Sequence, residues 1–227
     1  MQEMFLDPFF HALRTEHSHL AVGSLPALRY PADILPFAGL SELTPEAMLS
    51  LAELLAPGED INVTGDDIPA TPHLELLRKL PVLQFQYPPD CVPEAAPDTA
   101  GILPLSAADA PAMVALTDVA FPGFYRPRTY LLGSYFGIRI DGELIAMAGE
   151  RVSLPGYREI SALCTHPSHT SKGYAAALTI HLLRSHAAAG LRSFLHVAAN
   201  NHRAIALYNR LGFLQTGEIA LSQLRRR

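Results

Sequence analysis

The sequence predicts a mixed α/β fold in two unequal parts, and three observations predict it. Hydrophobic residues make up 49% of the 227 residues and charged residues 17%, enough apolar material for a buried core. A proline-rich stretch at 88–104 interrupts any regular period, so we expect a boundary near residue 98. After it, β-prone runs and Ala/Leu-rich runs alternate in the order β-α-α-β-β-β-α-β-α-β. The domains expected are therefore 1–98 and 99–227.

The first part, residues 1–98, is predicted to be a smaller α/β domain and carries no chemical motif. Thr44 is typical of a helix N-cap because Pro45 follows it at the first helical position. The elements expected are, in order, a helix over 5–16, extended segments over 25–39, a helix from 45, and strands at 60–63 and 81–87.

The second part, residues 99–227, has a clearer pattern. Two β-prone runs flank Asp141-Gly142, which predicts a hairpin over 135–149. Gly190 and Gly212 follow helical runs, as glycine does at helix C-termini. The other elements expected are a strand at 102–105, helices at 106–119 and 126–134, a strand at 158–165, a helix at 173–189, a strand at 193–199, a helix at 201–211 and a strand from 213.

Composition excludes several classes of protein. No apolar run approaches the about 20 residues that span a bilayer. The N-terminus has acids and histidines where a signal peptide would be basic and then apolar. Cys91 and Cys164 lie far apart without metal-ligand spacing, so we expect reduced thiols and a cytoplasmic protein.

Charge is unevenly distributed. Residues 1–98 hold 4 lysines and arginines against 15 aspartates and glutamates, whereas residues 99–227 hold 13 against 7. Two interpretations stay open: the solvated surfaces differ by chance, or the second part handles an anion. No concentrated basic stripe with aromatic residues indicates a nucleic-acid partner.

One stretch carries chemistry: a strand over 158–165, a polar loop, and Lys172-Gly173-Tyr174-Ala175 at the start of a helix. A helix N-terminus offers unpaired amide N–H groups and the positive end of the dipole, which suits a diphosphate. Gly173 allows close approach of a ligand to the backbone, and Lys172 adds a charge. The phosphate-loop pattern of nucleoside triphosphatases and the dinucleotide-binding glycine pattern are both absent from the sequence.

Residues 143–213 resemble the GNAT (GCN5-related) N-acetyltransferases. The family's Q/R-x-x-G-x-G/A loop is similar to 170–175, and its N-x-x-A-x-x-L-Y-x-x-x-G-F motif is similar to 201–213 without a gap. The matching positions of the second motif are Asn201, Ala204, Leu207, Tyr208, Gly212 and Phe213. The resemblance implies a GNAT-type splayed central sheet flanked by helices, extends loosely over 102–142, and says little about 1–100.

The resemblance also implies acetyl-CoA as cosubstrate and no metal. The backbone of the strand before the loop, at Leu163, Cys164 and Thr165, would pair with the pantetheine arm like an added strand. The amides of the loop and first helical turn would hold the pyrophosphate, and Asn201 would cap its helix and touch the cofactor arm. Thr170 departs from the usual Gln or Arg. The loop and first-turn residues are Thr170, Ser171, Lys172, Gly173, Tyr174, Ala175 and Ala176.

Tyr208 is the candidate general acid. In the family, a tyrosine at this position of the motif typically protonates the departing thiolate. From periodicity alone, Tyr208 is an amphipathic packing residue beside Ile205 and Leu211.

Two glutamates are candidate bases that would take a proton from the acceptor amine. Glu159 lies at the start of the strand, where the histone-modifying branch of the family has a glutamate, and we favour it; its alternative is a solvent-facing residue beside Arg158. Glu150 at the end of the hairpin is the rival, and its alternative is an ion-pair partner for Arg151.

Other chemistry-bearing residues have simpler interpretations. Cys164 lies in a strand without a clear histidine partner, so we expect a small buried residue rather than a nucleophile. The histidines at 166, 169, 196 and 202 lack the spacing of a metal site. The aromatic loop at 121–125 is equally consistent with an acceptor pocket lining and with ordinary packing.

The function expected is therefore acetyl-CoA-dependent acetyl transfer by direct attack of a primary amine of a small molecule or peptide. The alternative is a non-enzymatic acetyl-CoA-binding module that docks a partner. For residues 1–98 we favour a degenerate GNAT-like half over an unrelated acceptor-specificity domain. We expect neither nucleic acid nor membrane as partner.

Overall fold

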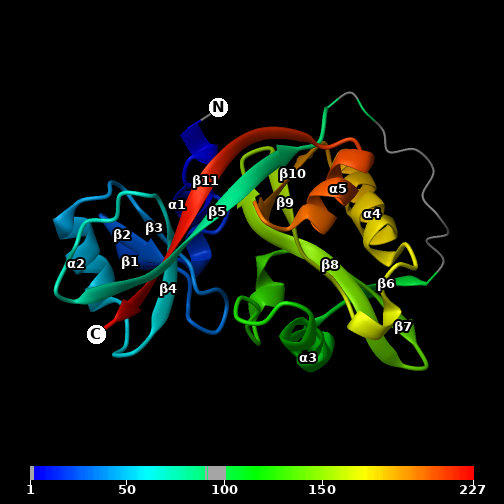
Figure 1. Cartoon of the computed structure of the whole chain (residues 1–227), viewed down its shortest axis with the longest axis horizontal. Coiled ribbons are helices and arrows are strands. Elements are labelled where there is room, and N and C mark those ends of the chain that lie inside the picture. The colour runs from blue at the N-terminus through cyan, green and yellow to red at the C-terminus, as the bar shows by residue number, and fades with distance from the viewer. Residues whose placement is uncertain (1–2, 90, 92–100) are drawn as a thin grey trace.

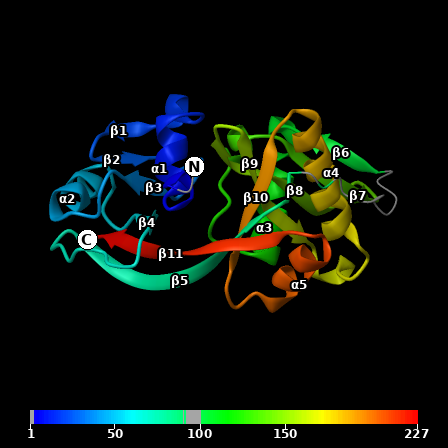
Figure 2. The same cartoon turned by 90° about the horizontal axis from the view of Figure 1, so that it is seen from above.

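The computed structural model describes residues 3–89, 91 and 101–227. The predicted boundary at residue 98 lies outside these residues. Two bodies are visible, and the long strands β5 (Leu74–Gln86) and β11 (Leu214–Arg226) run from one to the other (Figures 1 and 2). The smaller body holds β1 to β4 and α2, and the larger body holds β6 to β10 with α3, α4 and α5.

The helices are few and short. The α-helices are α1 (Pro8–Arg14), α2 (Pro45–Glu53), α3 (Ala110–Ala120), α4 (Tyr174–Ala188) and α5 (His202–Arg210). Single 3-10 turns are η1 (Glu3–Phe5), η2 (Ser18–Leu20), η3 (Ala107–Asp109), η4 (Thr129–Leu132) and η5 (Pro167–His169).

Two sheets contain all the described strands. The small antiparallel sheet has β1 (Val22–Ser24), β2 (Ala27–Arg29) and β3 (Ala38–Leu40). The eight-stranded sheet has the order β4-β11-β5-β10-β9-β8-β7-β6. Its remaining strands are β4 (Asp60–Thr64), β6 (Ile102–Leu105), β7 (Tyr135–Ile140), β8 (Glu143–Leu154), β9 (Tyr157–Thr165) and β10 (Arg192–Ala198).

The large sheet contains strands from both sides of residue 98. β5 pairs with β10 and β11, and β4 pairs with β11, all antiparallel. The first part therefore supplies two strands to the sheet of the second part. The first part is not all helical, and its kinship with the second part stays a prediction.

β9 and β10 splay apart, which opens the middle of the sheet. They are the one parallel pair in the described sheet, and their register ends at Phe194 opposite Glu159. Beyond that point β9 also carries a bulge: Met147 pairs with Cys164 and Gly149 with Ser161, so β9 has one extra residue. Ala162 within it has φ of +50°, a left-handed value that is rare for alanine.

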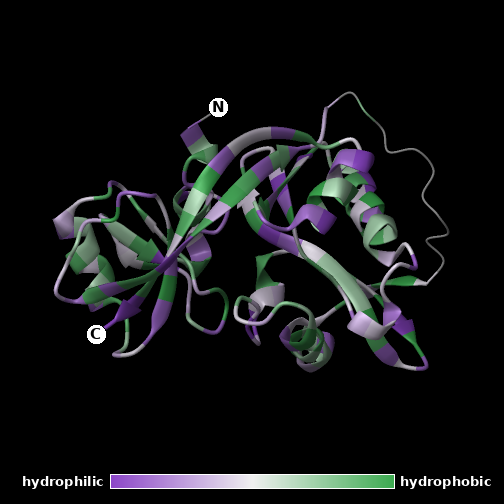
Figure 3. Ribbon diagram, viewed as in Figure 1, coloured by the Kyte–Doolittle hydropathy of each residue, from purple (hydrophilic) through white to green (hydrophobic). Residues whose placement is uncertain are grey.

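Helices cover both faces of the opened sheet. On one face, α4 packs its leucines with Ala146, Ala148 and Ile160 in a core that includes Tyr208 and Phe213. On the other, α3 packs Met113 and Leu116 against strand residues of β8 and β9 in a second core. Figure 3 shows hydrophobic residues along these strands and the helices that cover them.

Most predicted elements are confirmed, with local exceptions. The hairpin around Asp141-Gly142 forms, and the Thr44 hydroxyl caps α2 by accepting a bond from the Ala47 N–H at 3.2 Å. The helix expected over 5–16 begins only at Pro8, because the Asp7 carboxylate caps it.

Two expectations about secondary structure are wrong in detail. The helix expected over 126–134 is one 3-10 turn, because the Thr129 hydroxyl bonds to the Arg126 N–H and the Ile34 carbonyl. The strand expected over 81–87 begins at Leu74 and passes through Pro81. Pairing with β11 along this length overrides the helix-forming composition of 74–80.

Candidate active site

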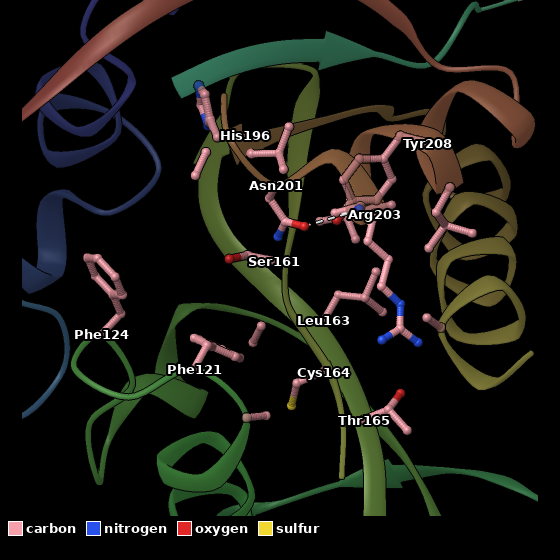
Figure 4. Close-up of a pocket in the computed structure, with 18 of the residues that line it drawn as sticks. Phe121, Phe124, Ser161, Leu163, Cys164, Thr165, His196, Asn201, Arg203 and Tyr208 are labelled. Atoms are coloured by element: carbon pink, nitrogen blue, oxygen red, sulfur yellow. Dashed lines mark hydrogen bonds between the residues drawn. The ribbon is translucent and has the colours of Figure 1, made fainter. Parts of the chain in front are cut away.

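A pocket of about 590 Å³ opens where β9 and β10 separate. Its wall includes all eleven residues predicted to contact the cofactor, together with Tyr208. Figure 4 shows the pocket running along β9, from His196 near one end to Thr165 near the other. The structure thus brings together residues that are almost forty positions apart in the chain.

The exposed backbone of β9 forms one side of the pocket. Among the described residues, the pairing of β9 with β10 stops at Glu159, while its pairing with β8 continues to Thr165. The edge over Ser161–Thr165 that faces β10 is therefore open to an added strand-like partner. The bulge at Ala162 turns the backbone locally within this stretch.

The N-terminus of α4 closes the far end of the pocket. Ser171 and Gly173 both have left-handed backbone, with φ of +64° and +84°, and Gly173 is the N-cap residue. No side chain caps this helix. A Cβ added to Gly173 would meet no atom within 4 Å, so the first-turn amides border open space. This geometry fits a bound phosphate group.

Basic side chains surround the same end. Lys172, Arg203 and Arg210 line the pocket, and no ion pair of Arg203 or Arg210 is found within the described ranges. The Arg203 guanidinium extends into the space between β9 and α4 (Figure 4). His169, also in the wall, has a buried Nδ1 without a hydrogen-bond partner in the structure. These groups suit a polyanion.

Asn201 links the pocket to α5. Its side-chain oxygen caps the helix by accepting a bond from the Ala204 N–H at 3.1 Å (Figure 4). Asn201 lines the pocket as well, so both roles expected for it are compatible with its position.

Tyr208 is a buried phenol in the pocket wall. Its side chain packs edge-on against Phe213 and tilted against Phe85, and the residue is 7% exposed. Burial raises the pKa of Tyr208 to about 12, so the phenol is protonated at neutral pH. It has the protonation state that a general acid needs.

Cys164 lines the pocket but has the properties of a core residue. It is 7% exposed and packs with Met147 and Tyr135. Burial raises the pKa of its thiol to about 12, which leaves little thiolate at neutral pH.

Glu159 is fully buried and paired, so it is not the solvent-facing residue that was the alternative. Its carboxylate accepts bonds from Arg151 Nε at 3.0 Å and Nη2 at 2.5 Å, and from His196 Nδ1 at 2.7 Å. Against the effect of burial, Arg151 and His196 lower the pKa of Glu159 to about 2. Arg151 and His196 line the pocket, whereas Glu159 lies behind them.

Glu150 faces the opposite side of the sheet. It pairs across the strands with Ile160, which packs in the α4 core. Its carboxylate accepts bonds from His186 Nε2 at 3.0 Å and the Ser134 N–H at 3.1 Å. These bonds lower its pKa although burial opposes them. Its hydrogen-bond partner is therefore His186 of α4, and Arg151 bonds to Glu159 instead.

The first part contributes to the pocket wall through Leu35, Leu80 and Val82. Phe121 and Phe124 of the aromatic loop line the same pocket. The aromatic loop therefore lines the pocket. No aspartate or glutamate does so in the part of the chain that the structure describes.

Comparison with known proteins agrees with this geometry. The family model described as FR47-like protein matches residues 135–220. A solved GNAT-family structure from Novosphingobium aromaticivorans is 33% identical, with a TM-score of 0.88 over 98% of both chains. The chain belongs to the GNAT family.

More distant GNAT structures share the fold alone. A GCN5-related N-acetyltransferase from Kribbella flavida is 19% identical, with a TM-score of 0.59 over 95% of each chain. One from Sphaerobacter thermophilus is 14% identical, with a TM-score of 0.55 over 89% of this chain and 78% of that one. No curated protein matches the sequence.

Several residues that line the pocket of this GNAT chain are not among those predicted from the sequence. Arg203 and Arg210 lie seven positions apart on α5, with Leu207 between them, so helical spacing places them on one face. That spacing was a usable signal. His196 and Arg151 give no local signal. The place in the sheet of β10, which carries His196, depends on a strand distant in the sequence.

Two further features of the GNAT chain concern metals and membranes. Among the described residues, no group of three or more His, Cys, Asp or Glu side chains could hold a metal ion. None of the helices in the described ranges is long and apolar enough to cross a membrane.

Proposed function

We propose that this GNAT protein transfers an acetyl group from acetyl-CoA to a primary amine of a small molecule or peptide, by direct attack of the amine on the thioester. One observation carries the proposal: the gap between β9 and β10 runs from the uncapped N-terminus of α4 to the buried phenol of Tyr208. A phosphate-binding end and a proton donor are thereby connected by an open strand edge.

Binding of acetyl-CoA would use three features of this gap. The first-turn amides of α4 and the left-handed Gly173 suit the pyrophosphate. Lys172, Arg203 and Arg210 supply positive charge around it. The free edge of β9 at Leu163–Thr165 suits the amide-containing pantetheine arm, which can pair with it as a strand would.

The chemistry requires a nucleophilic amine and a stable leaving thiol. The C–N bond forms as the C–S bond breaks, and the Tyr208 hydroxyl protonates the departing sulfur. A backbone N–H of the bulged β9 segment would polarise the thioester carbonyl. The raised pKa and burial of Cys164 favour direct transfer over a covalent acetyl-enzyme.

Neither candidate glutamate is well suited to accept the proton of the acceptor amine. Glu159 and Glu150 both have carboxylates whose oxygens are already bonded, and neither lines the pocket. A pKa of about 2 also makes Glu159 a weak base. The arrangement therefore favours a base other than either carboxylate.

An amine panel with acetyl-CoA tests this function. Release of free thiol is followed for small amines and for peptides with free amino groups, and mass spectrometry identifies the acetylated product. We expect amine-dependent thiol release with at least one acceptor. Tight binding of acetyl-CoA without turnover on any amine would indicate the non-enzymatic module instead. The predicted cytoplasmic location stays a prediction.

A further inference from the structure

Two buried histidine–glutamate pairs lie on opposite faces of the large sheet. One joins His196 of β10 to Glu159 of β9, with Nδ1 2.7 Å from Oε1. The other joins His186 of α4 to Glu150 of β8, with Nε2 3.0 Å from Oε1. Both histidine side chains are 2–3% exposed, so burial does not distinguish the two pairs. Their positions relative to the pocket do distinguish them, because His196 lines the pocket and His186 does not.

The back pair is complete within the protein. The second ring nitrogen of His186, Nδ1, lies 2.8 Å from the Ser193 hydroxyl. Both nitrogens of His186 are therefore held between a carboxylate and a hydroxyl, beneath α4. This pair has the properties of a structural hydrogen-bond network.

The pocket pair differs in two ways: its ring lines the pocket, and the second ring nitrogen of His196 meets an amide in place of a hydroxyl. The Gln84 side-chain nitrogen donates to the Phe5 carbonyl, which fixes the orientation of that amide. The same nitrogen lies 3.1 Å from His196 Nε2 and so donates to it. With Nδ1–H donating to Glu159, the network assigns a neutral ring whose lone pair is on Nε2.

We propose that His196 is the general base of this enzyme and that Glu159 is its positioning residue. The proposal rests on the proposed acetyl transfer and names the residue that accepts the proton. Its ring lies at the end of the pocket beyond Ser161, and Phe121 and Phe124 also line the pocket (Figure 4). His196 and the open edge of β9 line the same pocket, so an acceptor amine bound there would reach Nε2 by displacing the Gln84 amide.

The proton balance is simple. The ammonium form of the acceptor gives one proton to His196 Nε2, displacing the weak bond from Gln84, and becomes a nucleophilic amine. C–N bond formation and C–S bond cleavage then release a thiolate, which takes the Tyr208 proton. The amide nitrogen loses its extra proton, which restores Tyr208 through water, and His196 returns its proton to solvent. One proton is released for each ammonium acetylated.

The charges around His196 support this role. The Glu159 carboxylate bonds to Nδ1 and stabilises the imidazolium that forms when Nε2 takes a proton. In the free enzyme, the Arg151 guanidinium neutralises the charge of this carboxylate. Tyr30, Tyr135 and Tyr208 also interact with Glu159 electrostatically. From β5, the neighbour facing the ring is the uncharged Gln84.

The test compares His196→Gln with His186→Gln, two buried histidines that each bond to a glutamate. For an acceptor found in the amine panel, kcat/KM is measured from pH 6 to 10. General acid–base catalysis contributes about 10²–10⁴-fold. We expect His196→Gln to lower kcat/KM about 100-fold at neutral pH, and the loss to shrink as free amine becomes abundant at high pH. His186→Gln should keep the wild-type pH profile even if it unfolds at a lower temperature.

Chemical rescue adds a readout that a structural role would not change. Imidazole added to His196→Ala should restore part of the lost rate, with no effect on the wild type. Glu159→Gln should move the pH profile while leaving KM for acetyl-CoA near the wild-type value. Circular dichroism establishes the folding of each variant. If His196→Gln is unfolded, the test is the dependence of wild-type kcat/KM on pH. A histidine base predicts that kcat/KM reaches a plateau at a pH well below the pKa of the acceptor amine.

The outcomes separate this inference from the proposed function. A wild type that acetylates amines, with a His196→Gln variant of unchanged pH profile, overturns the assignment of His196 and leaves the acetyltransferase intact. A folded wild type that acetylates no amine overturns the function and the assignment together. A log-linear rise of the wild-type rate with pH and no plateau also overturns a histidine base.

Discussion

Arg151 and Glu159 form a two-point ion pair that is held under the aromatic side chains of the first part. Arg151 Nε lies 3.0 Å from Glu159 Oε2, and its guanidinium lies over the rings of Phe9 and Phe37, at 5.3 and 5.4 Å from their centroids. Residues near the N-terminus thereby cover the charged pair that positions His196. The smaller body is structurally coupled to the pocket through this contact.

Breaking this pair should destabilise the fold strongly. Glu159→Gln leaves Arg151 buried without its counter-charge, which typically costs about 3–5 kcal/mol. We expect the free energy of unfolding at pH 7, from urea denaturation, to fall by that order. The matched variant Glu143→Gln, at an exposed position of the same sheet, should change it by less than about 0.5 kcal/mol. An equal effect of the two variants would contradict the ion-pair account.

The same carboxylate predicts a loss of stability in acid. Its pKa is lowered from 4.5 to about 2, so the folded state binds its proton less readily than the unfolded state. Stability from this group is present above about pH 4.5 and is lost as the pH falls toward 2. Glu159→Gln should therefore flatten the dependence of unfolding free energy on pH between 5 and 2.

Asp7 should show the opposite dependence. Burial raises its pKa from 3.8 to about 6, so the folded state binds a proton more readily and stability falls as the pH rises from about 4 to 6. Asp7→Asn keeps an oxygen for the Phe10 N–H, which Asp7 caps at 3.0 Å. We expect this variant to be more stable than the wild type at pH 7.5, by thermal denaturation. Asp118→Asn, exposed on α3, should leave the melting temperature unchanged.

Tyr208→Phe tests the general acid. The ring still packs between Phe85 and Phe213, so folding and acetyl-CoA binding should survive. Loss of the hydroxyl should lower kcat at least about tenfold, with little change in KM for acetyl-CoA. Tyr30→Phe is the control, because it removes a buried phenol that bonds to His17 and does not line the pocket. A wild-type kcat in Tyr208→Phe would remove the role assigned to Tyr208.

Cys164→Ala should retain activity within about tenfold of the wild type. Direct attack needs no nucleophilic thiol, and a buried thiol with a pKa of about 12 is mostly protonated. Intact-mass measurement of the enzyme with acetyl-CoA alone should show no covalent acetyl group. An acetyl group on Cys164 that an amine removes would establish a two-step route instead.

Much of the second part could be predicted because its signals are local. The Asp141-Gly142 turn, the glycine before α4 and the motif of α5 each lie within a few residues of the structure they specify. Residues 74–80 gave no strand signal, because their conformation depends on pairing with a strand at the other end of the chain.

The candidate site divides in the same way. The proposed anion-binding end follows from one loop and one helix start, and the sequence indicates it. The proposed proton-transfer end depends on which residues of β8, β9, β10 and α4 face one another, and that register is not local. Glu159 and Glu150 were therefore found as acidic residues, while their histidine partners were not.

The central claim, that the N-terminus of α4 binds the pyrophosphate of acetyl-CoA, is tested most directly by ligand-induced stabilisation of two glycine variants. Gly173 and Gly190 flank α4 at its two ends, have φ of +84° and +69°, and each borders open space. Gly173→Asp and Gly190→Asp thus carry similar backbone strain and the same added charge. We predict that CoA raises the melting temperature of the wild type and of Gly190→Asp, and that Gly173→Asp shows no such rise. A rise in folded Gly173→Asp equal to that of Gly190→Asp would contradict the account.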